Sequence, residues 1–264
     1  MARPHVGMLV ALLALSASPR AHAEALDAAP ARACLERNSP KTTLSFRAEF
    51  VKVDRLGGER ASRATVIGKK LEDGLRRVVL RFDRPPDVRG TAMLMIESAT
   101  GPSDFYVFSP DDRRVRRIAS RSKGGLFGTD FTYDDFENWR SFQRNGAIQR
   151  LPDAVVGDRP VYVLENAGVV AEGSTYERVV SSIDRETCVV LQVDSFEAGG
   201  RLRKVLRADP TKVKQVGSIS FASAVELEDV IDQTRTRVAV DELKLDTQIP
   251  DSRFRSSDLG SGGE

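Results

Sequence analysis

Residues 92–118 read AMLMIESATGPSDFYVFSPDDRRVRRI, and this stretch decides the fold class. Short runs with the side-chain alternation of β-strands are separated by glycine, proline, serine and aspartate residues that favour turns. In the first run Met93 and Met95 alternate with Leu94, so both faces of the predicted strand are apolar. Antiparallel sheets usually keep one wet face. Two interpretations remain open: a curled sheet with a cover on its other side, or an ordinary sandwiched core.

The same two-residue period continues on both sides of this stretch. We predict strands over residues 44–53, 61–71, 76–83, 91–97, 105–108, 114–119, 161–164, 176–183, 189–196, 202–208, 219–230 and 235–245. Short turns join them and almost no helical pattern intervenes, which favours an antiparallel meander over a βαβ fold. The chain shows no linker and no internal repeat, so we predict a single, mainly β domain.

The first 23 residues have the pattern of a secretory signal peptide. Arg3 gives a basic start, residues 6–15 form an apolar run too short to span a bilayer, and residues 21–23 read AHA, the small-x-small form of a cleavage site. We therefore expect a chain that is soluble after cleavage. The expected divisions are a signal peptide over 1–23, an N-terminal segment or helix over 24–40, the β domain over 41–254 and a flexible tail over 255–264.

The leader also holds both histidines, His5 and His22, and two of the 40 basic residues, Arg3 and Arg20. The mature chain then carries 38 Lys and Arg residues against 38 Asp and Glu residues, so the basic balance of the full chain disappears. Nothing in this balance points to nucleic acid. Without histidine, Ser-His-Asp and Cys-His catalysis and the usual histidine zinc sites are excluded.

Cys34 and Cys188 are the only cysteines in the chain. In an oxidising compartment an even pair is typical of a disulfide, and the alternative is two unrelated buried thiols. We predict a Cys34–Cys188 disulfide that ties the N-terminal segment to the strand beginning near Val189.

A dense aromatic and acidic segment follows, where residues 122–139 read SKGGLFGTDFTYDDFENW. Its acids lack the alternate spacing of a calcium-binding loop, and its glycines lack the lysine and the strand-to-helix setting of a phosphate-binding loop. Ser122 or Thr129 as a nucleophile with Lys123 as its base is a weak pattern. The segment therefore gives little support to a metal site, a phosphate site or a catalytic loop.

A short amphipathic helix explains this segment better. Thr132 or Asp130 can cap it, and Asp134 and Asp135 fall in its first turn, where acids suit the helix dipole. We expect its aromatic side to face the apolar interior and its acids to keep the outer side in water. Glycine permits backbone angles that other residues reach only with strain, so we predict a lid on a glycine hinge. The hinge residues are Gly124, Gly125 and Gly128, and the lid side chains are Leu126, Phe127, Phe131, Tyr133, Phe136 and Trp139.

Several motifs carry a resemblance to a known family. They read DFYVFSP at 104–110, RVRRI at 114–118, GTDFTYDDF at 128–136, RLRKVL at 201–206 and IPDSRF at 249–254. Together they resemble the LolA-like outer-membrane lipoprotein-sorting family of Gram-negative periplasmic proteins. That family typically has Gly-Ser-Asp-Phe-Ser-Tyr-Glu-Asp in the third motif, so Thr129, Thr132 and Asp134 are mild departures. The similarity covers nearly the whole mature chain.

The resemblance implies a single curved antiparallel sheet, a half-barrel, with a few short helices covering an apolar concave face. It also implies a periplasmic carrier of lipid or lipoprotein acyl chains, without a cofactor. An inner-membrane exporter of the MMPL/RND type and an outer-membrane acceptor are the partners it suggests. The alternatives are a soluble adaptor of an export system that carries nothing, and a histidine-free hydrolase. The expected cavity wall includes Met93, Met95, Phe105 and Phe108.

Basic residues cluster between positions 113 and 123. A solvated strand face is one interpretation of this cluster. A docking face for anionic headgroups or for an acidic membrane partner is the other. Asp111, Asp112 and Asp130 lie near enough in sequence to neutralise part of the charge.

Overall fold

The computed structural model of the chain describes residues 26–72, 74–118, 125–141, 148–167 and 174–261. Its α-helices are α1 (Ala29–Arg37) and α2 (Tyr133–Ser141). The strands before α2 are β1 (Thr43–Val53), β2 (Glu59–Lys70), β3 (Arg76–Arg84), β4 (Ala92–Ile96), β5 (Asp104–Ser109) and β6 (Arg114–Ile118). Those after it are β7 (Ile148–Val156), β8 (Arg159–Ala167), β9 (Arg178–Asp184), β10 (Val190–Glu197), β11 (Arg201–Ala208), β12 (Val213–Val216), β13 (Ile219–Ala222), β14 (Ala224–Asp229) and β15 (Thr234–Leu245). Short 3-10 turns are η1 (Leu126–Gly128), η2 (Ala198–Gly200), η3 (Pro210–Lys212), η4 (Asp251–Phe254) and η5 (Ser256–Asp258).

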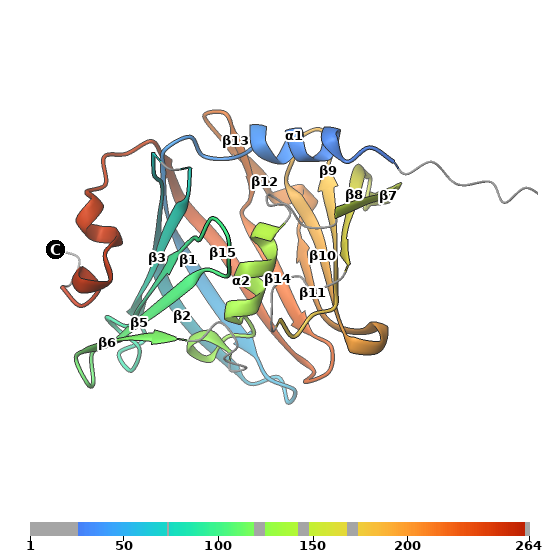
Figure 1. Cartoon of the computed structure of the whole chain (residues 1–264). Helices are drawn as coiled ribbons and strands as arrows, with labels where there is room; N and C mark the ends of the chain where they lie inside the picture. Colours follow the sequence, from blue (N-terminus) through green and yellow to red (C-terminus); the bar gives the residue numbers. More distant parts are fainter. Residues whose placement is uncertain (1–25, 73, 119–124, 142–147, 168–173, 262–264) are drawn as a thin grey trace, which may run out of the picture.

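One antiparallel sheet of 13 strands dominates the fold, in the order β6-β5-β4-β3-β2-β1-β15-β14-β11-β10-β9-β8-β7. Strands β1 to β6 run outward as a meander to one edge, and β7 to β11 run inward from the other edge. The two halves meet because β15 pairs with β1 and β14 pairs with β11. The sheet curls without closing into a barrel, since β6 and β7 form separate edges (Figure 1). The predicted mainly β class and the single curved antiparallel sheet are confirmed.

The helices lie where they can cover the interior of this curve. Helix α2 belongs to the connection between the edge strands β6 and β7, and Figure 1 shows it inside the curved sheet. Helix α1 lies across one end of the sheet in the same view.

Side chains that point into the curve form a continuous apolar cluster. Ala48 and Phe50 of β1 face inward, and Leu80 and Phe82 of β3 join them because alternate residues on a strand share one face. Further strands of both halves contribute to the same cluster, including Leu164 of β8. Removal of this apolar surface from water is the main favourable contribution to folding.

Two segments cover the outer face of the sheet. Over one half, Val79, Ala92 and Leu94 form a separate apolar cluster with Phe254 and Leu259 of the C-terminal segment. Over the other half, the two-stranded hairpin β12–β13 packs against outward-facing side chains of β8 and β10; the residues of this third cluster include Val161, Val163, Leu191, Val213 and Ala222. The strands are apolar on both faces because the sheet is curled and also covered on its outside, which is the first of the two interpretations of the sequence.

The C-terminal segment corrects the expectation of a flexible tail from residue 255. Leu259 is only 1% exposed, and Arg81 donates a hydrogen bond from Nη2 to the Leu259 carbonyl oxygen at 2.6 Å. The turn η5 brings Leu259 to this position. The segment is polar and rich in glycine, so its composition predicts looseness, but Leu259 packs on the outer face of the sheet beside Phe254.

Helix α1 lies within the predicted N-terminal segment, and Ala31 and Cys34 are its buried residues. Cys34 and Cys188 form the predicted disulfide, with their Cα atoms 5.2 Å apart, so α1 is tied to the loop between β9 and β10. The predicted signal peptide lies outside the described residues. In the described part of the chain, no helix combines the length and the hydropathy needed to cross a membrane.

Candidate functional site

The concave face of the sheet is the candidate binding surface. Met93, Met95 and Phe105, all predicted for the cavity wall, lie together in its apolar cluster at 1%, 3% and 0% exposure. Phe108 does not join them, because it packs on the outer face in the cluster with the C-terminal segment. Residues 105 and 108 lie an odd number of positions apart on β5, so they point to opposite faces. Placing both on one wall was therefore wrong.

Helix α2 begins at Tyr133 because Thr132 and Asp135 cap it reciprocally. The Asp135 carboxylate accepts hydrogen bonds from the Thr132 N–H at 2.7 Å and from the Thr132 hydroxyl at 2.9 Å. The Thr132 Oγ1 accepts the N–H of Asp135 at 3.3 Å. This is the geometry of a capping box, with Asp in the place of Glu. The short helix, one of its two predicted caps and the acids of its first turn are thus present as predicted.

Tyr133 and Phe136 of this helix, and Phe131 just before it, pack into the concave face. Phe131 lies against Phe50, with their ring centroids 6.3 Å apart. The ring centroids of Tyr133 and Phe105 are 5.0 Å apart. Phe136 packs on Phe131 at 6.1 Å and stays partly exposed. Aromatic pairs of this kind contribute about 0.5–1.5 kcal/mol each beyond their buried area. The segment therefore covers the apolar face in this structure.

The acids of this segment do not keep an outer side in water, which corrects the sequence-based expectation. Asp130, Asp135 and Glu137 are 6%, 3% and 8% exposed. Lys204 of β11, itself buried, donates from Nζ to Asp135 Oδ2 at 2.7 Å and to the carbonyl oxygen of Asp130 at 2.7 Å. Tyr176 donates its hydroxyl proton to Asp135 Oδ1 at 2.6 Å. Burial, followed by the charge of Asp135, raises the pKa of Tyr176, so this hydroxyl keeps its proton.

Asp130 is held by three side chains of the sheet. Lys52 of β1 forms an ion pair with Asp130 Oδ1, and Thr234 of β15 donates to the same oxygen. Thr236 donates to Oδ2 at 2.7 Å, and its hydroxyl oxygen accepts the N–H of Asp130 at 2.9 Å. A carboxylate is costly to bury unless it is paired and hydrogen-bonded. These partners therefore fix the start of the covering segment to β1 and β15.

Two further acids connect α2 to neighbouring loops. Glu137 Oε2 accepts the N–H of Ser103, just before β5, at 3.1 Å. Asp134 accepts the Ser174 hydroxyl at 2.8 Å and the Thr175 N–H at 2.7 Å. Burial raises the pKa of Asp134, and the hydrogen bonds from Thr175 and Ser174 offset part of that rise.

Among the residues that the structure describes, no group of three or more His, Cys, Asp or Glu side chains is placed to hold a metal ion.

Two glycines of the predicted hinge lie in a closed turn. Gly128 has a φ of +77°, a backbone conformation that favours glycine. At Gly125, a Cβ atom would lie 2.1 Å from the carbonyl oxygen of Thr129, so only glycine fits. On the same turn, the ring of Phe127 lies 5.0 Å from that of Phe82. Both glycines fit a fixed turn in this structure, and motion about them stays a prediction.

The remaining predicted lid and hinge residues are placed only in part. Leu126 is buried in the concave cluster at 6% exposure. Trp139 lies on α2, but its side chain falls outside the described part of the structure. Gly124 lies outside the described residues altogether.

We expect Gly125→Ala to lower the free energy of unfolding by about 1–3 kcal/mol, the usual range for forcing extra atoms into a packed site. The new methyl group would meet a backbone oxygen, which cannot swing aside as the end of a flexible side chain can. Gly101→Ala is the matched control, because a Cβ atom there would meet only the Ser98 Oγ at 3.8 Å. Urea unfolding measures both variants, and equal stability would show that the turn has room.

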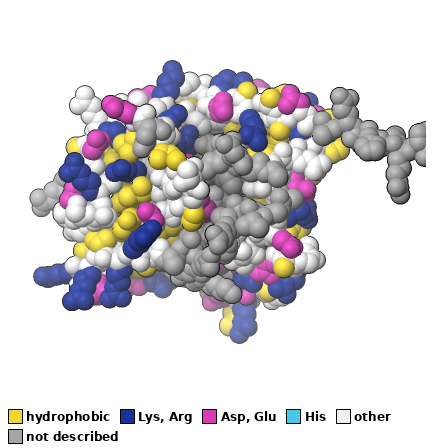
Figure 2. Space-filling view, in the orientation of Figure 1, with side chains coloured by type: hydrophobic (Ala, Val, Ile, Leu, Met, Phe, Trp, Pro, Cys, Tyr) yellow, Lys and Arg dark blue, Asp and Glu magenta, His cyan; other side chains and the backbone are white. Residues whose placement is uncertain are grey.

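Several side chains of the concave face were missed by the sequence reasoning. They pack on the apolar cluster but remain partly exposed, and they include Phe46, Val78, Val107 and Ile118. Alternation could have found Val107, since it follows Phe105 by two residues on β5. Figure 2 shows hydrophobic side chains gathered on one part of the face that is turned to the viewer. These partly exposed positions are better candidates for ligand contact than the fully buried methionines.

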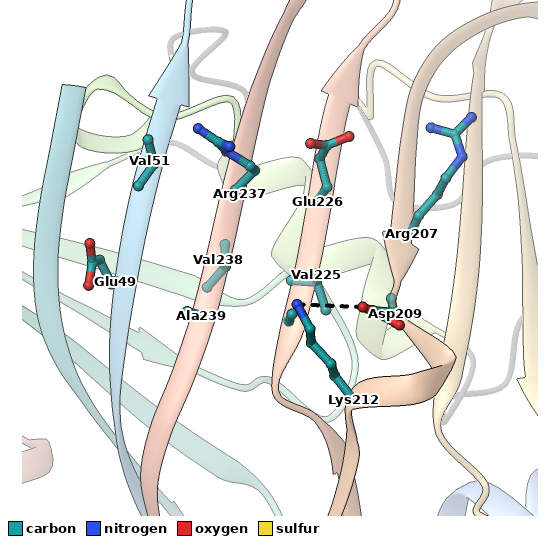
Figure 3. Close-up of a pocket in the computed structure, with 12 residues that line it drawn as sticks. Glu49, Val51, Arg207, Asp209, Lys212, Val225, Glu226, Arg237, Val238 and Ala239 are labelled. Carbon is teal, nitrogen blue, oxygen red and sulfur yellow. Dashed lines mark ion pairs between the residues drawn. The ribbon is translucent and has the colours of Figure 1, made fainter. Parts of the chain in front are cut away.

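A groove of about 530 Å³ lies on the outer face of β1, β15, β14 and β11. Figure 3 shows Arg237, Glu226 and Arg207 on neighbouring strands along it. Lys212 forms an ion pair with Asp209 at 3.6 Å at one end. Charges of both signs suit neither an acyl chain nor a simple anion, so this groove is not the candidate site.

The curved sheet with its covering helices is a LolA-like fold, which places the protein in that structural class. A domain from Vibrio parahaemolyticus, described as an outer membrane lipoprotein-sorting protein domain, matches with a TM-score of 0.79 over 88% of this chain and 97% of its own, at 23% identity. A DUF1329 family protein from Desulfovibrio piger matches with a TM-score of 0.79 over 88% of this chain and 96% of its own, at 21% identity. A LolA superfamily protein from Nitrosomonas europaea matches with a TM-score of 0.64 over 85% of this chain and 97% of its own, at 19% identity. The predicted resemblance to LolA-like proteins is thus confirmed at the level of the fold.

The sequence also places the chain in a particular family. The model of a family described as "Uncharacterized protein" matches residues 74–261, and the chain belongs to this family. No curated protein matches the sequence.

Proposed function

We propose that the protein binds the acyl chains of a lipid or lipoprotein on its concave face and carries them through the periplasm toward the outer membrane. The observation that carries this proposal is the apolar concave face, on which side chains such as Val107 and Ile118 remain partly exposed. The LolA-like fold supports it, since a protein of the same fold is described as a lipoprotein-sorting domain.

An acyl chain needs such a surface to cross an aqueous compartment. Each methylene exposed to water costs about 0.8 kcal/mol, so a chain of roughly sixteen carbons costs on the order of 10 kcal/mol. A curved apolar face removes this cost without a catalytic residue, and we infer a binding protein rather than an enzyme. The proposed partners are an inner-membrane exporter that supplies the lipid and an outer-membrane acceptor.

We infer further that α2 and the turn before it cover the bound chain. Phe131 and Phe136 occupy the concave face, and a bound acyl chain would replace their contacts with contacts of the same apolar kind. For the cover to move, the ion pair between Lys204 and Asp135 has to break. Gly125 and its neighbours also have to leave their closed turn.

A soluble adaptor of an MMPL/RND-type export system is the second candidate function. The filled part of the interior favours it, because Met93, Met95 and Phe105 leave almost no exposed surface for a ligand. The hydrolase interpretation gains no such support. The buried Lys204 donates to a carboxylate and to a carbonyl oxygen, and not to a serine that it could activate.

Val107→Gln tests carriage, because it places an amide on the partly exposed concave wall. Desolvating an amide without a partner costs about 1–3 kcal/mol, so we expect the affinity for a long-chain fatty acid to fall by about tenfold or more. The control is Val51→Gln, a change of the same kind at a half-buried position of β1 that lines the outer groove. It should leave fatty-acid affinity unchanged.

Titration followed by the fluorescence of the single tryptophan, together with native mass spectrometry of protein isolated gently from periplasm, provides the measurement. Saturable binding that Val107→Gln weakens and Val51→Gln does not supports the carrier. A wild-type protein that retains no lipid and binds no fatty acid would leave the adaptor as the better function.

A further inference from the structure

We propose that one end of the sheet docks on a lipid bilayer with anionic headgroups. This end carries the β1–β2, β5–β6 and β14–β15 turns, which lie along the lower edge of the molecule in Figure 1. We call the surface the turn rim and define it by Arg55, Leu56, Arg113, Arg114 and Val230. The proposal is independent of what the concave face carries, since it concerns the outside of the molecule.

Leu56 is held in water by the turn that carries it. Its side chain is 88% exposed at the tip of the β1–β2 turn. The Asp54 carboxylate accepts the N–H of Leu56 at 2.8 Å and that of Gly58 at 2.9 Å, and the N–H of Gly57 donates to the Asp54 carbonyl oxygen at 3.0 Å. These hydrogen bonds keep the turn from folding Leu56 back onto the protein. The side chain is therefore presented outward by a hydrogen-bonded turn.

A single exposed leucine is common on protein surfaces, so its surroundings decide whether it has a role. Val230, which is 38% exposed, lies on the β14–β15 turn. Val53 at the end of β1 pairs with Arg235 near the start of β15, so the two turns leave the sheet side by side. Two exposed apolar side chains thus share one end of the molecule.

Exposed arginines complete the rim. Arg55 precedes Leu56 directly, and Arg113 and Arg114 stand at the β5–β6 turn, all three exposed. Within the described part of the chain, no ion pair is formed by any of these three side chains. The basic cluster near position 113 in the sequence therefore has two parts. Among the described residues Arg113 and Arg114 are unpaired, whereas Arg116 is paired with Asp112 and Arg117 with Asp104.

Acids on the same turns are mostly engaged by the protein itself. The Asp54 carboxylate accepts the hydrogen bonds of its own turn, and Asp112 is paired with Arg116. On the β14–β15 turn, Asp232 is paired with Arg203 at 2.6 Å. Asp111 is exposed at the β5–β6 turn. The carboxylates of Asp54 and Asp111 form no ion pair among the described residues, so against the three arginines the rim keeps a small net positive charge.

An apolar tip on the same edge of the molecule as free arginines has the chemistry of a bilayer interface. The guanidinium groups can contact lipid phosphates while Leu56 enters the boundary between headgroups and acyl chains. A nucleic acid would offer phosphates but no apolar layer next to them. A protein partner would have to offer both, and vesicles without protein test that alternative directly.

Co-sedimentation with vesicles of phosphatidylglycerol and phosphatidylcholine, and with vesicles of phosphatidylcholine alone, tests the proposal on the full mature chain. We expect binding to the anionic vesicles that weakens as salt is raised. Arg113→Gln/Arg114→Gln should reduce it by about 30-fold, from the contribution of each cation near an anionic surface. Leu56→Ser should reduce it by about tenfold, because a partly inserted leucine side chain is lost.

Matched controls lie at the opposite end of the sheet. Val155→Ser removes an apolar side chain that is 64% exposed near the end of β7. Lys70→Gln/Lys244→Gln removes two exposed cations from the ends of β2 and β15. Both controls should bind anionic vesicles as the wild type does. The proposal is overturned if the wild type ignores anionic vesicles, or if the control variants lose as much binding as the rim variants.

Discussion

Lys204→Met is expected to lower the free energy of unfolding by about 3–5 kcal/mol, the range for breaking a buried ion pair from one side. Methionine keeps most of the side-chain volume but removes the ammonium group. The Asp135 carboxylate, at 3% exposure, is then left with hydrogen bonds from Tyr176 and Thr132 but without a cation. Urea unfolding followed by the fluorescence of the single tryptophan measures the loss.

A matched control for this change lies on the same strand. Arg207 and Glu228 form an ion pair whose side chains are 51% and 43% exposed, so Arg207→Met should change stability by about 1 kcal/mol or less. Adding Asp135→Asn to Lys204→Met removes both buried charges and keeps an oxygen for the helix cap. This double variant should recover much of the lost stability. Equal losses for Lys204→Met and Arg207→Met would contradict the role given to the buried pair.

The sequence predicts the strands and their two-sided burial because alternation is local. Residues 92–118 alone indicate three short strands, the first two with apolar residues on both faces, and β4, β5 and β6 occupy that stretch. The sequence does not predict which strands that are far apart in the chain become neighbours in the sheet, such as β15 and β1. That pairing depends on contacts between segments that are far apart in the chain, and no local period reports them.

The candidate site was also predictable only where its contacts are local in sequence. The Thr132 cap could be predicted because its partner Asp135 lies three residues away. Burial of the acids could not, since Lys204 lies 69 positions from Asp135 and Thr236 lies 106 positions from Asp130. Without knowledge of those partners, an acid on an amphipathic helix is expected to face water. The polar contacts that hold the cover closed are therefore a finding of the structure.

Removing the Cys34–Cys188 disulfide by Cys34→Ala/Cys188→Ala is expected to cost about 2–5 kcal/mol. The bridge joins residues 154 positions apart, so it restricts much of the unfolded chain. It also ties α1 to the loop between β9 and β10. Alanine is preferred to serine because both positions are buried, at 2% and 3% exposure, and a hydroxyl there would need a partner.

The urea dependence of unfolding separates the two origins of this loss. If the bridge acts by restricting the unfolded chain, its removal lets that chain expand, and the slope m should rise along with the fall in stability. If it acts mainly by holding α1 in place, the midpoint should fall while m stays the same. Free-thiol labelling of the unfolded, unreduced wild type is the control, and two reactive thiols per chain would contradict the disulfide itself. Loop-closure entropy grows only slowly with loop length, so a loss well above about 5 kcal/mol would have to include native contacts of α1.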